Sequence, residues 1–188
     1  MLVLLLGSMF LNLILGWQLR ILRLHGSAQI SQAVAVAPGT SLTSLRVSDL
    51  NGEPSNIEFA SQPRPSVLYV LNPHCHWCAS NANNIRTLGR RASVAYRFVG
   101  ISLDDGGLTE YAKLQDLSFP VYSISSYGVA PQLGLGGTPE MIVLSGEGKV
   151  LRAWLGTLTG GQLKEVEAYF AVSLPGPTRE PERAAAGR

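Results

Sequence analysis

A short apolar run that ends in a turn and a cysteine pair is the feature that most constrains this chain. Ser66–Leu71, SVLYVL, carries no charge, as expected for a strand that is covered on both faces. Asn72-Pro73-His74 ends the run, and apolar residues then recur at helical spacing from Cys78 up to the basic pair Arg90-Arg91. Positive charge is favourable at a helix C-terminus. The sequence therefore predicts strand, turn and helix, with Cys75 at the turn.

Strand and helix signals alternate through the rest of the chain. A βαβ unit followed by a hairpin and a closing helix predicts an α/β protein, an α/β/α sandwich around a central mixed sheet. Thr159-Gly160-Gly161-Gln162 fits a capping box that would begin the closing helix. The other expected elements are strands over Tyr96–Leu103 and, at a sheet edge, Pro120–Ile124, a helix over Gly107–Leu117, and a hairpin of Glu140–Ser145 with Lys149–Leu155.

The two ends of the chain differ from its middle. Met1–Trp17 is almost entirely apolar, and with Gln18–Leu24 it reaches the roughly 20 residues that cross a bilayer. We expect an uncleaved, single-pass transmembrane helix, because neither a basic start nor a small-residue cleavage site marks a signal peptide. A buried core helix is the alternative. The expected organisation is a membrane anchor over 1–24, a linker over 25–40, a folded domain over 41–172 and a disordered tail over 173–188.

Composition limits the classes of partner. The 188 residues give room for one globular domain with an extension at each end. Fifteen Lys and Arg residues nearly balance thirteen Asp and Glu residues, so no strong electrostatic field is implied. Nucleic-acid binding therefore has no support in the sequence.

The chain has only two cysteines, Cys75 and Cys78, three positions apart. A disulfide that closes so short a loop removes little entropy from the unfolded chain, so a purely structural bridge explains the pair poorly. Two cysteines are also too few for the disulfide framework of a small secreted domain. Redox chemistry and metal binding are the two remaining interpretations.

A position at the start of a helix makes a cysteine reactive. Unpaired backbone N–H groups and the positive end of the helix dipole both favour the thiolate, so we expect Cys75 to be the nucleophile. Cys78, one turn further in, should be buried and less acidic, and would resolve the mixed disulfide. His76 lies between them, and a protonated imidazole there, or at His74, would stabilise the thiolate further.

Metal binding is the main alternative interpretation of Cys75 and Cys78. A structural zinc ion needs four ligands, and His74 and His76 with the two cysteines would crowd all four into five residues. Copper suits thiolate and imidazole ligands better, so a copper-delivery module stays open, although no histidine follows His76. No metal or other cofactor is otherwise expected.

Two motifs together resemble a known family. Asn-Pro-His-Cys-His-Trp-Cys over residues 72–78 follows one strand, and Gly137-Thr138-Pro139-Glu140 precedes another. Over residues 41–172 this arrangement resembles the thioredoxin superfamily, specifically its membrane-anchored TlpA/ResA-like thiol-disulfide oxidoreductases, which carry a redoxin domain. The resemblance implies disulfide exchange with protein thiol or disulfide substrates and with an unidentified redox partner.

The resemblance also assigns supporting residues. Pro139 would carry a cis bond after Thr138 and lie against the cysteine pair, where the Thr138 backbone could pair with an extended substrate segment. His76 and Trp77 would form the dipeptide that helps to set redox poise.

The side of the membrane is a separate question. Arg20 and Arg23 follow the apolar run, and the positive-inside tendency would place them in the cytoplasm. The resemblance implies instead an extracytoplasmic domain on the periplasmic side, where disulfide substrates occur.

Several residues depart from family patterns. Thioredoxin itself has a buried aspartate six residues before the first cysteine, and here Tyr69 stands at that position. The helix after the motif lacks the proline that commonly kinks it and the acidic residue of many TlpA-like members. A thiol peroxidase is a further alternative on the same fold, but Leu68 and Asn72 replace the Pro and Thr/Ser of the peroxiredoxin signature before Cys75.

Overall fold

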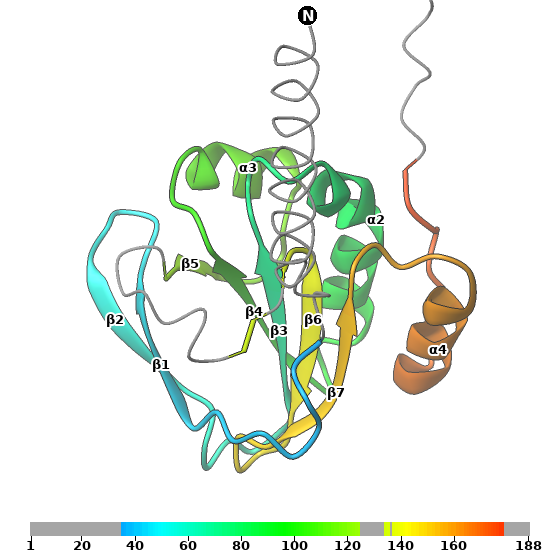
Figure 1. Cartoon of the computed structure of the whole chain (residues 1–188), viewed down its shortest axis with the longest axis horizontal. Coiled ribbons are helices and arrows are strands. Elements are labelled where there is room, and N and C mark those ends of the chain that lie inside the picture. The colour runs from blue at the N-terminus through cyan, green and yellow to red at the C-terminus, as the bar shows by residue number, and fades with distance from the viewer. Residues whose placement is uncertain (1–34, 125–133, 136, 179–188) are drawn as a thin grey trace, which may run out of the picture. The chain divides into compact units, whose positions relative to one another are not determined.

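The computed structural model of the chain describes residues 35–124, 134–135 and 137–178. They form a seven-stranded mixed sheet in the order β2-β1-β5-β4-β3-β6-β7, with β2 and β7 at its two edges (Figure 1). The predicted mixed α/β fold is thus confirmed. The elements are β1 (Ser44–Ser48), β2 (Pro54–Glu58), β3 (Ser66–Leu71), α2 (His76–Arg91), β4 (Arg97–Ser102), α3 (Leu108–Leu114), β5 (Val121–Ser123), β6 (Glu140–Leu144), β7 (Val150–Leu155) and α4 (Gly160–Phe170).

Strand β3 is the centre of the sheet. It pairs in parallel with β4 and antiparallel with β6, and all six of its residues are buried, as the uncharged run predicts. Because side chains alternate along a strand, Val67, Tyr69 and Leu71 face one core cluster while Leu68 and Val70 face the other. The chain leaves the C-terminal end of β3 through a short turn and then enters α2.

All three described helices pack on the same face of the sheet. Helix α2 buries Cys78, Ile85 and Leu88, the stripe predicted from the sequence, in the cluster that contains Tyr69. Helices α3 and α4 contribute their buried residues to that cluster as well. Within the described part of the chain, the opposite face is covered by strands and loops, so the second helical layer of the predicted sandwich is not found there.

The segment predicted as an edge strand lies inside the sheet. Strand β5 pairs with β4 on one side, while Ser48 of β1 pairs with Ser123 on the other. The edge prediction was wrong because the β1–β2 hairpin extends the sheet beyond β5. β1 buries Leu45 and Val47 at alternate positions, whereas β2 is polar and exposed apart from Ile57, so the sequence of β2 carries a weak strand signal.

The predicted capping box at the start of α4 does not form. Thr159 occupies the N-cap position, but its side chain makes no capping hydrogen bond. The Gln162 side chain instead donates to the carbonyl of Leu155, in the preceding strand. The helix begins where the sequence indicates, with a different partner for its glutamine.

Parts of the expected linker and tail contact the domain. Val36 is buried, and the Gly39 N–H donates to the carbonyl of Val150. Near the other end Leu174 is buried, and Thr178 exchanges backbone and side-chain hydrogen bonds with Ser80 on α2. The predicted anchor over 1–24 lies outside the described residues, as do 25–34 and 179–188. No helix of the described residues is long and apolar enough to cross a membrane.

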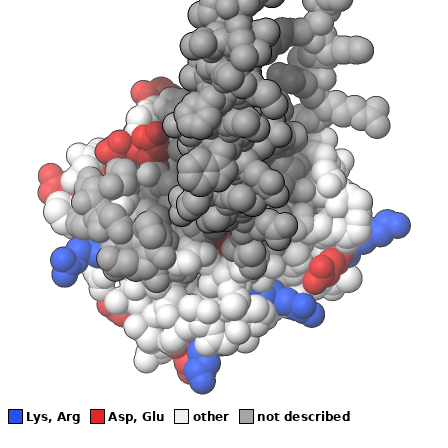
Figure 2. All heavy atoms as spheres, viewed as in Figure 1, with Lys and Arg blue, Asp and Glu red and all other residues white. Residues whose placement is uncertain are grey.

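The basic side chains on the face seen in Figure 2 lie apart from one another. They form no continuous positive patch there, in keeping with the net charge of +2.

The turn between β6 and β7 gives a test of the fold. Gly148 has a φ of +78°, and an added Cβ would lie 2.5 Å from the carbonyl oxygen of Leu42. Gly52 has a φ of +85° with nothing within 4 Å of an added Cβ, so it is a matched control. Gly52→Ala should cost about 1 kcal/mol from the left-handed backbone alone, and Gly148→Ala roughly 1–3 kcal/mol more because of the clash. Urea unfolding measures both, and equal losses would contradict this packing.

Candidate functional site

The site lies where β3 ends and α2 begins. Cys75 is the N-cap residue of α2, with extended backbone (φ −80°, ψ 113°), and its Sγ accepts the backbone N–H of Cys78 at 3.3 Å. The Cys75 N–H in turn donates to the carbonyl of Asn72, which closes the turn after the strand. The sulfur therefore does what a serine or aspartate oxygen usually does at this position.

A second loop meets Cys75 because of the sheet register. Val70 near the end of β3 pairs with Glu140, the first residue of β6, so the segment just before β6 lies beside the start of α2. The Thr138-Pro139 bond in that segment is cis, as predicted. The Cys75 thiol donates to the Thr138 carbonyl across 3.5 Å, although 63 positions separate the two residues.

The pKa values of the two thiols are shifted in opposite directions. Partial burial alone would raise the pKa of Cys75, but hydrogen bonds from the Thr138 side chain, the Cys78 thiol and the N–H groups of Cys78 and Trp77 outweigh it, so the pKa is lowered. The first turn of α2 holds no acidic residue that would oppose a thiolate. Burial raises the pKa of Cys78 to about 12, and the nearby Cys75 sulfur contributes to the rise. Both cysteines are free thiols.

The predicted supporting residues His74, His76 and Trp77 flank the cysteines in the chain, and their side chains are exposed. His76 and Trp77 are exposed and touch edge to face, with ring centroids 5.2 Å apart; Trp77 is 61% exposed. His74 is also exposed, and its backbone N–H donates to the Asn72 side chain. In the described part of the chain, neither imidazole hydrogen-bonds to a cysteine sulfur.

An open groove adjoins the cysteine turn. Its volume is about 680 Å³, and it lies between the residues just before Cys75 and helix α3. Among the residues that line it, Leu114 of α3 is 80% exposed, so an apolar side chain faces solvent there. The lining residues include Pro73, His74, Glu110, Tyr111, Lys113 and Leu114.

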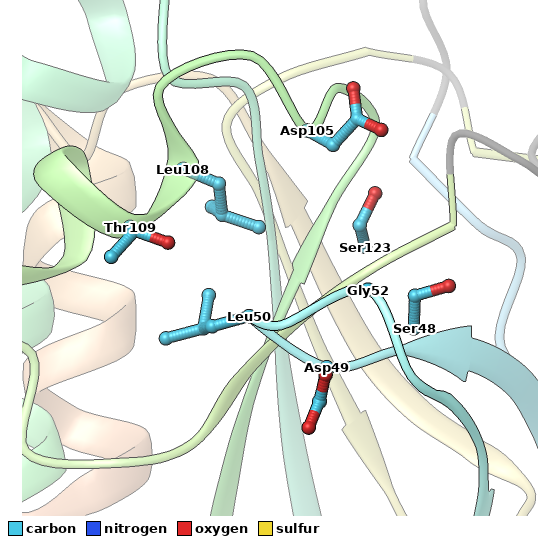
Figure 3. A pocket seen from close by; sticks show the side chains of 8 residues that line it. All are labelled: Ser48, Asp49, Leu50, Gly52, Asp105, Leu108, Thr109 and Ser123. Carbon is cyan, nitrogen blue, oxygen red and sulfur yellow. The ribbon is translucent and has the colours of Figure 1, made fainter.

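A second, smaller pocket contains none of the predicted site residues. It encloses about 130 Å³ between the β1–β2 turn and the start of α3. Figure 3 shows the carboxylates of Asp49 and Asp105 on opposite sides, not converging on one point. The backbone N–H groups of Glu53 and Asn51 hold the Asp49 carboxylate and lower its pKa, so it stabilises the turn. No cluster of three metal-ligating side chains occurs among the described residues.

Sequence reasoning missed the polar groups behind Cys78. Tyr69 is noticeable in the sequence only as the residue in place of an aspartate, and Tyr111 only as part of an apolar stripe. Both lie in the core cluster that contains Cys78, with Asn81 of α2 also buried nearby. The alternation along β3 does place Tyr69 on the same face as the helix, so that half of the arrangement was available from sequence.

Comparison with known proteins identifies the fold. No family model and no curated protein matches the sequence. Among solved structures, a secreted disulfide oxidoreductase of Mycobacterium tuberculosis, described as homologous to E. coli DsbE, superposes with a TM-score of 0.55 at 19% identity, over 68% of this chain and 94% of that one. The chain has a thioredoxin-like fold. StoA from Bacillus subtilis matches with a TM-score of 0.52 at 19% identity, over 68% of this chain and 98% of its own.

The same fold also matches a protein with a different printed function. The peroxidoxin BcpB of Mycobacterium tuberculosis superposes with a TM-score of 0.55 at 22% identity, over 71% of this chain and 94% of that one. Identities this low show the fold alone, so the choice between activities depends on the residues of the site.

The opposite pKa shifts predict which sulfur reacts. Thiolate is the reactive form, so alkylation of Cys75 by iodoacetamide should rise with pH around a midpoint below that of a free cysteine. Cys78 should stay unmodified at neutral pH because its pKa is about 12. Intact-mass spectrometry across a pH series measures both, and Cys75→Ser should remove the modification. Equal modification of Cys78 at neutral pH would contradict the assignment.

Proposed function

We propose that this protein is a thiol-disulfide oxidoreductase that exchanges disulfides with protein partners through Cys75 and Cys78. One observation carries the proposal: Cys75 caps α2 beside Thr138 with a lowered pKa, while Cys78 lies buried one turn behind it. This is the division between an attacking and a resolving thiol. Within the thioredoxin-like fold we favour a TlpA/ResA-like member.

The reaction needs only the two cysteines and the partner. The Cys75 thiolate attacks one sulfur of a partner disulfide, the partner's other sulfur leaves and takes a proton from solvent, and a mixed disulfide forms. Cys78 then loses its proton and attacks the Cys75 sulfur, which closes the Cys75–Cys78 disulfide and releases the partner as a thiol. The partner gains two electrons and the cysteine pair loses them; the reverse sequence oxidises a partner.

Features around the sulfur favour a protein substrate. Trp77 presents a large exposed ring next to Cys75, and the groove along Pro73 and Leu114 gives apolar surface on the other side of the turn. Aromatic side chains that remain exposed are common anchors for a protein partner. In this proposal the Thr138 backbone pairs with an extended substrate segment, while His76 and Trp77 adjust the redox poise.

Insulin reduction tests the proposal directly. With dithiothreitol as reductant, the protein should accelerate the cleavage of insulin disulfides, and Cys75→Ser should lose all acceleration because the attacking sulfur is gone. Cys78→Ser, reduced beforehand and freed of dithiothreitol, should instead accumulate a mixed disulfide with insulin, visible as a reducible adduct on a non-reducing gel. Undiminished activity in Cys75→Ser would end the proposal.

A thiol peroxidase is the second candidate, favoured by the match to the peroxidoxin BcpB. Two residues before Cys75 argue against it, because Leu68 is a buried core residue of β3 and Asn72 in the turn has no hydroxyl to donate. Rapid peroxide consumption that depends on Cys75 would favour this candidate.

The copper-binding alternative at His74 and His76 has a separate test. If it holds, the protein should retain copper through dialysis, and changing either histidine should abolish that retention.

We further propose that residues 1–24 tether the domain to a membrane and place it on the extracytoplasmic, periplasmic side. The apolar length of the segment supports a single span, and disulfide substrates are found on the oxidising side. In spheroplasts of a bacterial host, added protease should therefore degrade the domain while a cytoplasmic marker survives. Protection until the membrane is lysed would place the domain inside, as Arg20 and Arg23 favour.

A further inference from the structure

Two tyrosine hydroxyls lie in the core behind the resolving cysteine. Cys78 is fully buried on α2, and Tyr69, 1% exposed, faces it from β3 within the same core cluster. Tyr111, 6% exposed, enters that cluster from α3. Neither hydroxyl has a hydrogen-bond partner of good geometry among the described residues. An unpaired hydroxyl in a core destabilises the folded state, so two of them in the cluster that contains Cys78 need an explanation.

Both phenols respond to the charge of the cysteine sulfurs. Burial raises the pKa of Tyr69 well above its ordinary value, and negative charge on Cys78 raises it further. Tyr111 is shifted in the same direction by the same two causes. Both therefore stay protonated at physiological pH, as neutral donors that cannot act as bases there. A hydrogen bond between the Tyr69 phenol and the Asn81 side chain, too poorly aligned to satisfy the hydroxyl, opposes this rise at Tyr69.

A buried thiolate at Cys78 has few other sources of stabilisation. Burial is the largest effect and opposes its charged form, as does the Cys75 sulfur, whereas the Asn72 backbone and the Thr138 side chain favour it. No acidic side chain stands at position 69 to accept the proton, because that position holds a tyrosine. Neutral donors that hydrogen-bond to the sulfur as its charge develops would meet this need without placing a second charge in the core.

We propose that the Tyr69 and Tyr111 hydroxyls donate hydrogen bonds to the Cys78 sulfur as it becomes a thiolate and attacks the mixed disulfide. The inference rests on the proposed exchange function and concerns only its second step. In that step the Cys78–H bond breaks, the Cys75–Cys78 disulfide forms, the bond between Cys75 and the partner breaks, and the partner's sulfur leaves as a thiol after taking up a proton. The tyrosines keep their own protons throughout.

The reaction with Ellman's reagent separates the two steps. The reduced protein should release one thionitrobenzoate when Cys75 attacks and a second when Cys78 resolves the adduct, as two phases in stopped flow. Tyr69→Phe and Tyr111→Phe should each slow the second phase about ten- to a hundredfold, the range of a hydrogen bond to a charged group, and leave the first within about twofold. Cys78→Ser should abolish the second phase and so assign it.

The matched control is Tyr122→Phe. Tyr122 lies on β5 and packs against the cluster on the opposite face of the sheet, so its loss of a hydroxyl should change neither phase. Urea unfolding of the Phe variants gives an independent measure, because removing an unpaired buried hydroxyl should leave stability equal or higher. The two tyrosines are changed separately, so one variant suffices if the other fails to fold.

The outcomes separate the inference from the function on which it rests. A missing first phase in the unchanged protein would overturn the proposed exchange itself. Two normal phases in the unchanged protein, with an unaltered second phase in both folded Phe variants, would overturn the role of the tyrosines alone. If both phases slow in the Phe variants and the variants are also less stable, the tyrosines serve packing, and their proposed role as donors is overturned as well.

Discussion

The hydrogen bond from the Cys78 backbone N–H to the Cys75 sulfur is the contact on which the rest of the site depends. It makes the sulfur the cap of α2, and it exposes that sulfur to the unpaired N–H groups and dipole of the helix. Burial alone would make Cys75 less acidic, so these hydrogen bonds decide the direction of its pKa. Because the same helix turn carries Cys78 into the core, one local structure gives the two sulfurs opposite properties.

The sheet positions the Thr138-Pro139 segment and supports the first turn of α2. The antiparallel pairing of β3 with β6 sets the Thr138-Pro139 segment against the end of β3, and the parallel pairing with β4 gives α2 the buried surface that holds its first turn in place. One register therefore brings Thr138, whose backbone is proposed to pair with substrate, to the end of β3 next to Cys75. Tyr69, the one polar residue on the helix-covered face of β3, lies in the same core cluster as Cys78.

Much of this arrangement could be predicted from the sequence, because it depends on local patterns. The uncharged run of β3, the helical spacing of Cys78, Ile85 and Leu88, and the glycine turn before β7 each specify an element. The position of β5 could not be predicted, because the strand that covers its edge, β1, is remote in sequence and pairs with it only through Ser48 and Ser123. The contacts of Tyr111 depend on how α3 enters the core cluster that also contains Cys78, which no local pattern encodes.

The central claim is that Cys75 ionises easily and Cys78 does not. Carbon-13 labelling of the two cysteines in the reduced, full-length protein, followed by NMR across a pH series, reads each Cβ shift as its own thiol titrates. The structure predicts that Cys75 titrates below a free cysteine, while Cys78 stays protonated until the pH approaches its pKa of about 12. Ordinary titration of both cysteines, or the reverse order, would contradict the account.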